Sequence, residues 1–468
     1  MTFLSTFPRH RAPLCLVLIH MLGIAVVVAG DPKPDTKFNV QSDQISFIEN
    51  GELKVGVNRD LGGAITWLST PEHGNLINNK DWGRQVQLSF YSGPQPFEPD
   101  GKKLHEHWKN WAWNPIQSGD VFRHRAKVVE LTNTGTSIHL VSVPMQWALE
   151  NVPGDCRFEA DLKLDGPMLR VHYRLTNQRT DHAWYGGHSQ ELPAVYTVSA
   201  LDHLMAYTGD QPFTGGQLTR IIKPPHQAFP WARFLATEGW VAAVGDDDWG
   251  IGVCNPTVYK YLGGTNTPRK TWDSNADPTM YISPVSRDVL DHNIVFDFDL
   301  MMRVGKLASL REYFCGIMAK QTPPAWRFTK DRQHWVPTGC ADAGWPVQDG
   351  LKLAISKEKT ASLEGPVQPY PAASASKLRV TGTWTGLAGT GHISWNKQGG
   401  APSPQPDSIT FPVPESGKET CVEIDLASAT GYDGLITQLT LWPADQQGTD
   451  GHVTVKSIEL IPANSVRH

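Results

Sequence analysis

The stretch Ile294–Val304, IVFDFDLMMRV, decides the fold class, because large apolar side chains occupy every second position along it. This period-two alternation is typical of a β-strand with one face in a core and the other in water. The same alternation occurs in Phe158–Asp165 and Leu169–Leu175. Asn50-Gly51 lies between two apolar runs, as in a two-residue hairpin turn. The sequence therefore predicts an all-β protein built from antiparallel strands.

The first residues are typical of a signal peptide rather than of a folded domain. Residues 1–30 combine basic residues, an apolar run from Leu14 to Val28 and small residues before Asp31. An uncleaved anchor is the alternative, but a span needs about 20 apolar residues, more than this run offers. We therefore expect a secreted or periplasmic protein that has no membrane attachment after cleavage.

The rest of the chain divides into two β-rich regions. Residues 326–350 are rich in proline, glycine and polar residues and lack a long alternating run, which predicts a linker. We expect a large domain over residues 31–325, closed by a helix over residues 306–320, and a smaller domain over residues 351–468.

The composition narrows the class of ligand. The chain has 468 residues, with 42 basic and 47 acidic side chains and a net charge of -5, and it contains no long basic run. Nucleic-acid binding of the usual kind needs a basic surplus, so it is not expected. The 17 tryptophans outnumber the 16 phenylalanines and 11 tyrosines. A sugar ring stacks well on a flat indole, so these tryptophans are candidates for carbohydrate contacts. The alternative is that they fill a β core.

Three segments resemble galactose mutarotase-like domains. Asn50–Asn58 followed by Leu61–Ile65 is similar to the start of such domains, and Ile294–Val304 is similar to their last strands. Asp81–Gln87 resembles their substrate-facing Gly-Arg segment. The resemblance implies that residues 31–325 form a large antiparallel β-supersandwich, the fold of aldose 1-epimerases and of domains in polysaccharide lyases and glycoside hydrolases. It also places three side chains toward a substrate, namely Asp81, Arg84 and Gln87.

The C-terminal region resembles a galactose-binding-like jelly-roll domain that binds carbohydrate, through Leu378–Gly382, Gly391–Trp395 and Leu439–Pro443. This resemblance implies a smaller β-sandwich. Its tryptophans at alternating positions are interpreted as core rather than as sugar platforms.

Trp184–Tyr196 concentrates side chains that can transfer protons, and we take His188, Glu191 and Tyr196 as catalytic candidates. On a regular strand His188 and Glu191 face opposite ways, so they share a site only if the chain bends. The glycines before His188 and the proline at 193 make a bend plausible. The alternative is a structural histidine and an ion-paired glutamate.

Lys103–Pro115 carries three tryptophans within six residues. Such a polar segment cannot bury all of them in a regular strand, so some are expected to line a sugar-binding groove. The alternative is a loop whose indoles plug the sandwich. A metal site is not expected, because the two histidines lack a third ligand. The candidate binding residues are His105, His107, Trp108, Trp111, Trp113 and Asn114.

The acidic turn Asp246–Asp248 is a candidate for a structural calcium ion, and its alternative is a solvated hairpin tip. No other cofactor is expected.

These features together favour a secreted enzyme that breaks glycosidic bonds in an extracellular polysaccharide or oligosaccharide. We lean to lyase-type elimination, in which His188 or Tyr196 takes a proton and Arg84 neutralises a uronate carboxylate. A glycoside hydrolase would instead pair Glu191 with a second carboxylate, such as Asp81 or one in Asp246–Asp248. A non-catalytic sugar-binding protein or an aldose epimerase-like protein is a further alternative. The lyase and hydrolase hypotheses both require the indole loop, the arginine turn and the bend at His188 and Glu191 to open onto one concavity.

Overall fold

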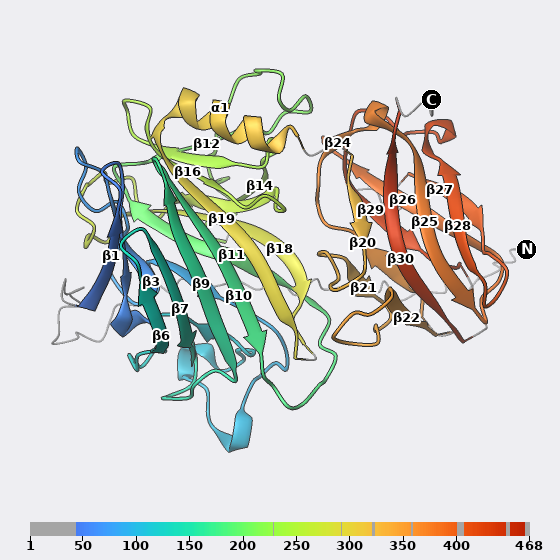
Figure 1. Ribbon diagram of the computed structural model, residues 1–468, viewed down its shortest axis with the longest axis horizontal. Helices are drawn as coiled ribbons and strands as arrows, with labels where there is room; N and C mark the ends of the chain where they lie inside the picture. The colour runs from blue at the N-terminus through green and yellow to red at the C-terminus, as the bar shows by residue number, and fades with distance from the viewer. Residues whose placement is uncertain are drawn as a thin grey trace, which may run out of the picture.

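The computed structural model describes residues 44–463, except residues 228, 292, 321–322, 357–358, 400–406 and 446–449. The predicted signal peptide lies outside the described residues. As predicted, the protein is all-β, with antiparallel sheets arranged as sandwiches (Figure 1).

The N-terminal body is a sandwich of a ten-stranded and a nine-stranded sheet. The ten-stranded sheet has the order β1-β2-β3-β4-β11-β18-β17-β14, and two short strands, β5 and β8, extend it from β4. Its strands are β1 (Ile45–Glu49), β2 (Lys54–Asn58), β3 (Ala64–Ser69), β4 (Val86–Ser89), β5 (Pro115–Ile116), β8 (Met145–Gln146), β11 (Gly187–Val198), β14 (Ala232–Leu235), β17 (Lys260–Thr265) and β18 (Thr279–Val289).

The nine-stranded sheet has the order β13-β12-β15-β16-β19-β10-β9-β7-β6. All three alternating runs that predicted strands lie here, in its three neighbouring strands β19, β10 and β9. Its strands are β6 (Lys127–Asn133), β7 (Ser137–Val143), β9 (Cys156–Asp165), β10 (Met168–Asn177), β12 (His203–Ala206), β13 (Thr219–Arg220), β15 (Val241–Val244), β16 (Trp249–Cys254) and β19 (Val295–Lys306).

The core of the N-terminal body lies between these two sheets. Val195 and Ile282 from the ten-stranded sheet pack in one apolar cluster with Leu162, Val171 and Leu300 from the nine-stranded sheet. One face of the ten-stranded sheet is therefore buried against this core. We call its opposite face the outer face.

The predicted helix is present as α1 (Leu307–Met318) and covers the other side of the nine-stranded sheet. Leu310, Phe314 and Met318 recur every four residues and are buried, which is the spacing of one helical face. Phe314 stacks on Trp240 with 5.8 Å between the ring centroids. Gly252 lets this ring come close, because a β-carbon there would lie 2.5 Å from it.

The C-terminal body is a second sandwich with its own apolar core. The segment expected as a linker is part of it, since Trp326, Phe328 and Trp335 are buried in that core. Trp384 and Trp395 also lie in the core, as the alternation predicts. One sheet contains β20 (Ala325–Arg327), β22 (Leu351–Ile355), β25 (Ala375–Thr385), β28 (Glu419–Asp425) and β30 (Gly451–Pro462), and the other contains β21 (Val336–Thr338), β23 (Ser362–Glu364), β24 (Tyr370–Pro371), β26 (Thr390–Lys397), β27 (Ser408–Pro412) and β29 (Leu435–Trp442).

Polar contacts join the two bodies, which lie side by side in Figure 1. Arg287 of β18 pairs with Glu364 of β23 at 2.6 Å, and His334 Nδ1 lies 2.8 Å from Asp288 Oδ1. A search of the described residues for a helix of sufficient length and apolarity to cross a bilayer finds none.

The packing of α1 gives a stability prediction. We expect Phe314→Ala to lower the free energy of unfolding by about 3–5 kcal/mol, because it leaves a cavity against Trp240. Urea denaturation measures the change. Ile222→Ala is the matched control, since Ile222 is 75% exposed and its loss is expected to change stability by less than about 0.5 kcal/mol. Equal losses in both variants would contradict this account of the helix.

Candidate functional site

An irregularity in β11 places Glu191 and Tyr196 on the same face of the sheet. Glu191 pairs with Val285 and Tyr196 pairs with Tyr281, so five steps along β11 match four along β18. The register shifts between Glu191 and Val195, which is the signature of a β-bulge. An odd spacing would otherwise separate the two side chains. Because Tyr281 packs away from the sandwich core, Glu191 and Tyr196 both lie on the outer face.

Three aromatic rings form a wall beside Glu191. Tyr281 lies 4.7 Å from both Tyr196 and Trp231, measured between ring centroids, and Trp231 lies 6.3 Å from Tyr196. Tyr281 and Trp231 are almost fully buried, whereas Tyr196 keeps part of its surface accessible. We call these three residues the aromatic wall.

Burial beside this wall raises the pKa of Glu191 to about 7, and the hydroxyl of Tyr281 offsets part of the effect. No ion pair of Glu191 is present among the described residues. Burial and the nearby Glu191 carboxyl also raise the pKa of Tyr196 well above its usual value. At neutral pH the site therefore contains a carboxyl near its midpoint of titration and a protonated phenol.

The arginine turn opens onto the same region. The charges of Asp81 and Arg84 both act on the pKa of Tyr196, the first raising it and the second lowering it. Arg84 is held by two carboxylates, with Nε 3.1 Å from Asp81 Oδ2 and one terminal nitrogen 3.0 Å from Asp277 Oδ1. Its other terminal nitrogen donates to the carbonyl of Asp277. All of the guanidinium nitrogens are thus already engaged.

His188 lies on the opposite face from Glu191. It pairs with Asp288, three residues from the partner of Glu191 on β18, and the pairing between these positions is regular. Its Nε2 lies 3.2 Å from the carbonyl of Tyr185, and burial lowers its pKa. The bend comes after Glu191 rather than between the two residues, so the structure does not bring His188 and Glu191 together.

The indole loop reaches the outer face through Asn114. The ring of Trp111 lies 4.5 Å from that of Trp108, and its Nε1 donates to Asn114 Oδ1 at 2.9 Å. Asn114 Nδ2 donates to Ser89 Oγ at 3.3 Å, and Ser89 is the neighbour of Glu191 across the β4–β11 pair. Trp108 and Trp111 are partly exposed. Trp111 also contacts Tyr91 at 5.4 Å, and the ring of Tyr91 lies 5.8 Å from that of His188.

Three of the predicted binding residues have structural contacts instead. One is Asn114, which is buried and whose Nδ2 also donates to the carbonyl of Phe90 at 2.6 Å. Trp113 is fully buried in the sandwich core, where its Nε1 donates to Asp155 Oδ1 at 2.7 Å. Gln87 is also buried, and its side chain bonds the backbone of Ser118 and Trp82. For Trp113 the alternative interpretation, an indole that fills the sandwich, is the one that the structure supports.

The two histidines of this loop lie further from the site. His105 and His107 stack at 5.1 Å, and His105 also contacts Phe122 at 5.1 Å. His107 is exposed to solvent. In the described part of the chain, neither histidine forms a hydrogen bond, ion pair or ring contact with Glu191 or with the aromatic wall.

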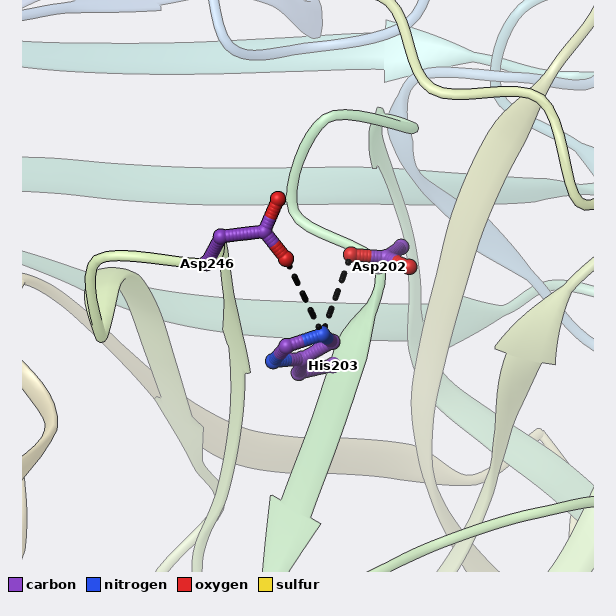
Figure 2. Close-up of side chains that lie close together, drawn as sticks. All are labelled: Asp202, His203 and Asp246. Atoms are coloured by element: carbon purple, nitrogen blue, oxygen red, sulfur yellow. Dashed lines mark ion pairs between the residues drawn. The ribbon is translucent and has the colours of Figure 1, made fainter.

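The acidic turn forms a separate cluster (Figure 2). Asp202, His203 and Asp246 bring possible ligand atoms within 4.8 Å of one another. However, Lys270 Nζ lies 2.9 Å from Asp202 Oδ1 and 2.6 Å from Asp246 Oδ1, so an ammonium already neutralises this group. The next residue of the turn, Asp247, pairs with Lys306 at 2.8 Å. The turn carboxylates therefore point to different partners.

Sequence reasoning missed Tyr281, Trp231 and Asp277. Each lies in a segment that our sequence interpretation did not single out, and each reaches the site through long-range pairing. The sequence around Tyr281 gives no signal for this position, because Met280 and Ile282 on either side of it are also apolar, although in the structure they face the core and Tyr281 does not.

No family model matches the chain, and no curated protein matches it. Among solved structures, it is similar to a putative aldose 1-epimerase from Escherichia coli K12, with 15% identity over 56% of this chain and 99% of that chain and a TM-score of 0.35. A galactose mutarotase-like protein from Lactobacillus casei matches with 11% identity over 56% of this chain and 100% of that chain, with a TM-score of 0.35. A polysaccharide lyase matches with 12% identity over 83% of this chain and 46% of that chain, with a TM-score of 0.32.

The raised pKa of Glu191 predicts a pH-dependent stability. Between its ordinary pKa of 4.5 and the folded value of about 7, the folded state binds the proton more tightly, so the free energy of unfolding falls as pH rises through this window. Glu191→Gln removes this loss. We expect the variant to gain about 1–3 kcal/mol relative to wild type between pH 4 and pH 8, measured by urea denaturation at both values. If the difference in the free energy of unfolding between variant and wild type is the same at pH 4 and pH 8, the carboxyl of Glu191 is not desolvated.

The lysine contacts of the acidic turn predict its response to calcium. Because Lys270 and Lys306 already neutralise Asp246 and Asp247, we expect calcium at about 10 mM to leave the melting temperature unchanged. EDTA is expected to have no effect either. Lys270→Gln is the matched variant, since it removes the competing ammonium. A saturable rise in the melting temperature of wild type would instead support the calcium site.

Proposed function

We propose that the protein is a secreted or periplasmic carbohydrate-active enzyme that cleaves an acidic polysaccharide by elimination. The observation that carries this proposal is the Glu191 carboxyl, with a pKa near 7, on the outer face beside the protonated Tyr196. A general base is most effective when its pKa is near the working pH, and a phenol with a raised pKa is a proton donor.

In this reaction Glu191 takes the proton on the carbon beside a uronate carboxylate. The electron pair of that C–H bond becomes a new carbon–carbon double bond, and the bond to the glycosidic oxygen breaks. Tyr196 donates its proton to the departing oxygen. Water then returns a proton to Tyr196 and removes one from Glu191, so the cycle closes without consuming water.

The site favours elimination over hydrolysis because Glu191 lacks a free carboxylate partner. Glycoside hydrolysis uses two carboxyl groups on either side of the bond. Asp81 and Asp277 both neutralise Arg84, and Asp246 and Asp247 belong to the separate lysine-paired cluster. Elimination needs only one base and one acid, which Glu191 and Tyr196 supply.

Two roles proposed from the sequence change with the geometry. His188 faces away from Glu191, and Tyr196 has its pKa raised rather than lowered, so neither suits the role of base. Arg84 is engaged by two carboxylates, so it orients the arginine turn rather than neutralising a further carboxylate. Trp108 and Trp111 provide indole faces for sugar rings.

The test follows two products at once. Alginate, polygalacturonate and neutral polysaccharides are incubated with the protein while absorbance of the new double bond and reducing ends are recorded. We expect both to rise together on a polyuronate. Glu191→Gln and Tyr196→Phe should lower kcat by about 10²–10⁴-fold, because each removes one proton transfer. His188→Ala is the matched control and should keep kcat within about tenfold. Reducing ends without a double bond would identify a hydrolase and overturn elimination.

A further inference from the structure

We propose that the pocket between the two bodies binds the carboxylate of the substrate's uronate unit through Lys260 and Arg287. This inference rests on the proposed function and names the group that the site recognises. It also makes the C-terminal body a wall of the active site rather than an appended module.

The pocket lies where the outer face meets the C-terminal body, and its volume is about 240 Å³. Strands β11, β17 and β18 supply one wall, and the C-terminal body supplies the other. We call it the interbody pocket. Among the residues that line it are Ser189, Lys260, Val285 and Arg287 on the first wall and Glu364 and Gln438 on the second.

The interbody pocket is lined by the basic side chains of Lys260 and Arg287 and by one acidic side chain, Glu364. Glu364 is the single acidic residue among those lining the pocket, and both of its oxygens are used. One lies 2.6 Å from Arg287, and the other accepts a hydrogen bond from Thr338 at 3.0 Å. Lys260 forms no ion pair or hydrogen bond among the described residues. The pocket therefore carries a lysine whose charge no side chain neutralises directly.

The surroundings of Lys260 lower its pKa. Its side chain is open to solvent within the pocket, but the protein on both walls desolvates it and lowers its pKa. The nearby charge of Arg287 lowers the pKa further, whereas Glu364 raises it. An anion bound between Lys260 and Arg287 would offset the repulsion between the two cations. Its contact with Arg287 would use the terminal nitrogen that bonds neither Glu364 nor the carbonyl of Gly187.

The interbody pocket adjoins the strand position of Glu191, although Glu191 itself does not line it. Val285 lines the pocket and is the direct strand partner of Glu191. Ser189 lines it too and lies two residues from Glu191 on the same face of β11, a distance of about 6.6 Å along a strand. A sugar held with its carboxylate in the pocket thus presents its adjoining carbon toward Glu191.

This placement also supplies what elimination requires. The proton beside a carboxylate becomes more acidic when a cation neutralises that carboxylate, because the negative charge that develops on it is stabilised. Arg84 is committed to Asp81 and Asp277, so we assign this role to Lys260, which lies on β17, one strand beyond the β18 partner of Glu191. Arg287 assists, with Glu364 holding its guanidinium from the other body.

Binding is measured in the Glu191→Gln background, in which the polymer is expected to be consumed at least about 100-fold more slowly. The probes are alginate and polygalacturonate, each beside its carboxyl-reduced form, which keeps the backbone but lacks the charge. We expect the charged polymer to bind better than the reduced one. Lys260→Gln should weaken binding of the charged polymer at least tenfold and leave the reduced polymer unaffected. Glu364→Gln should strengthen binding of the charged polymer, because it removes the one acidic lining residue.

The matched control is Lys127→Gln, which removes an exposed lysine on strand β6 of the other sheet. It should leave both affinities unchanged, and all variants should keep the melting temperature of the parent. Equal binding of charged and reduced polymers, or an unchanged affinity in Lys260→Gln, would overturn the proposal.

Activity of the otherwise wild-type chain separates this proposal from the proposed function. Binding that depends on Lys260 without formation of a double bond would refute elimination and leave the carboxylate site standing. If the double bond forms and Lys260→Gln changes neither kcat nor KM, elimination stands and the carboxylate site is refuted. A rise in KM or a fall in kcat of at least tenfold in Lys260→Gln would support both.

Discussion

One extra residue in β11 decides which side chains the outer face can bring together. Side chains alternate along a strand, so groups five positions apart ordinarily face opposite sides. The bulge between Glu191 and Val195 cancels this and lets Leu192 and Val195 both enter the core while Glu191 and Tyr196 both stay outside. The buried apolar pair is what holds the irregularity in place, since slipping the register by one residue would move one of them out of the core.

The character of Glu191 follows from what surrounds it. An isolated carboxylate is expensive to desolvate, so a carboxyl beside buried aromatic rings keeps its proton up to near-neutral pH. Asp246 and Asp247 show the opposite outcome in the same protein, because contacts with Lys270 and Lys306 lower their pKa values. The difference between a proton-transfer group and a surface ion pair is thus set by the neighbours, although all three residues are ordinary carboxylates in the sequence.

Local patterns predicted the strands and the helix, because alternation and the four-residue spacing of apolar residues report directly on one buried face. They could not reveal the bulge, because five positions separate Glu191 from Tyr196 and an odd spacing predicts opposite faces. Only the pairing with β18, where the partners are four positions apart, shows that the two side chains share a face. They also could not pair Arg84 with Asp277 or place Trp113 in the core beside Asp155, because these contacts join distant parts of the chain. The expected linker failed for a related reason: its tryptophans fill a core whose strands come later in the sequence.

The ion pair between the two bodies contributes little to the free energy of folding, and its main effect is on how the charges around the interbody pocket are arranged. Arg287 and Glu364 are both partly exposed, and such a pair contributes only about 0–1 kcal/mol. What the pair changes is the distribution of charge, because it consumes the one acidic side chain lining the interbody pocket and leaves Lys260 uncompensated. His334, which is mostly buried against Asp288, fixes the C-terminal body at the edge of β18, close to this pair. The uncompensated charge of Lys260 lies in a pocket that is also lined by Val285, the strand partner of Glu191. This placement favours a C-terminal body that takes part in the site at Glu191 over one that binds sugar at a separate place.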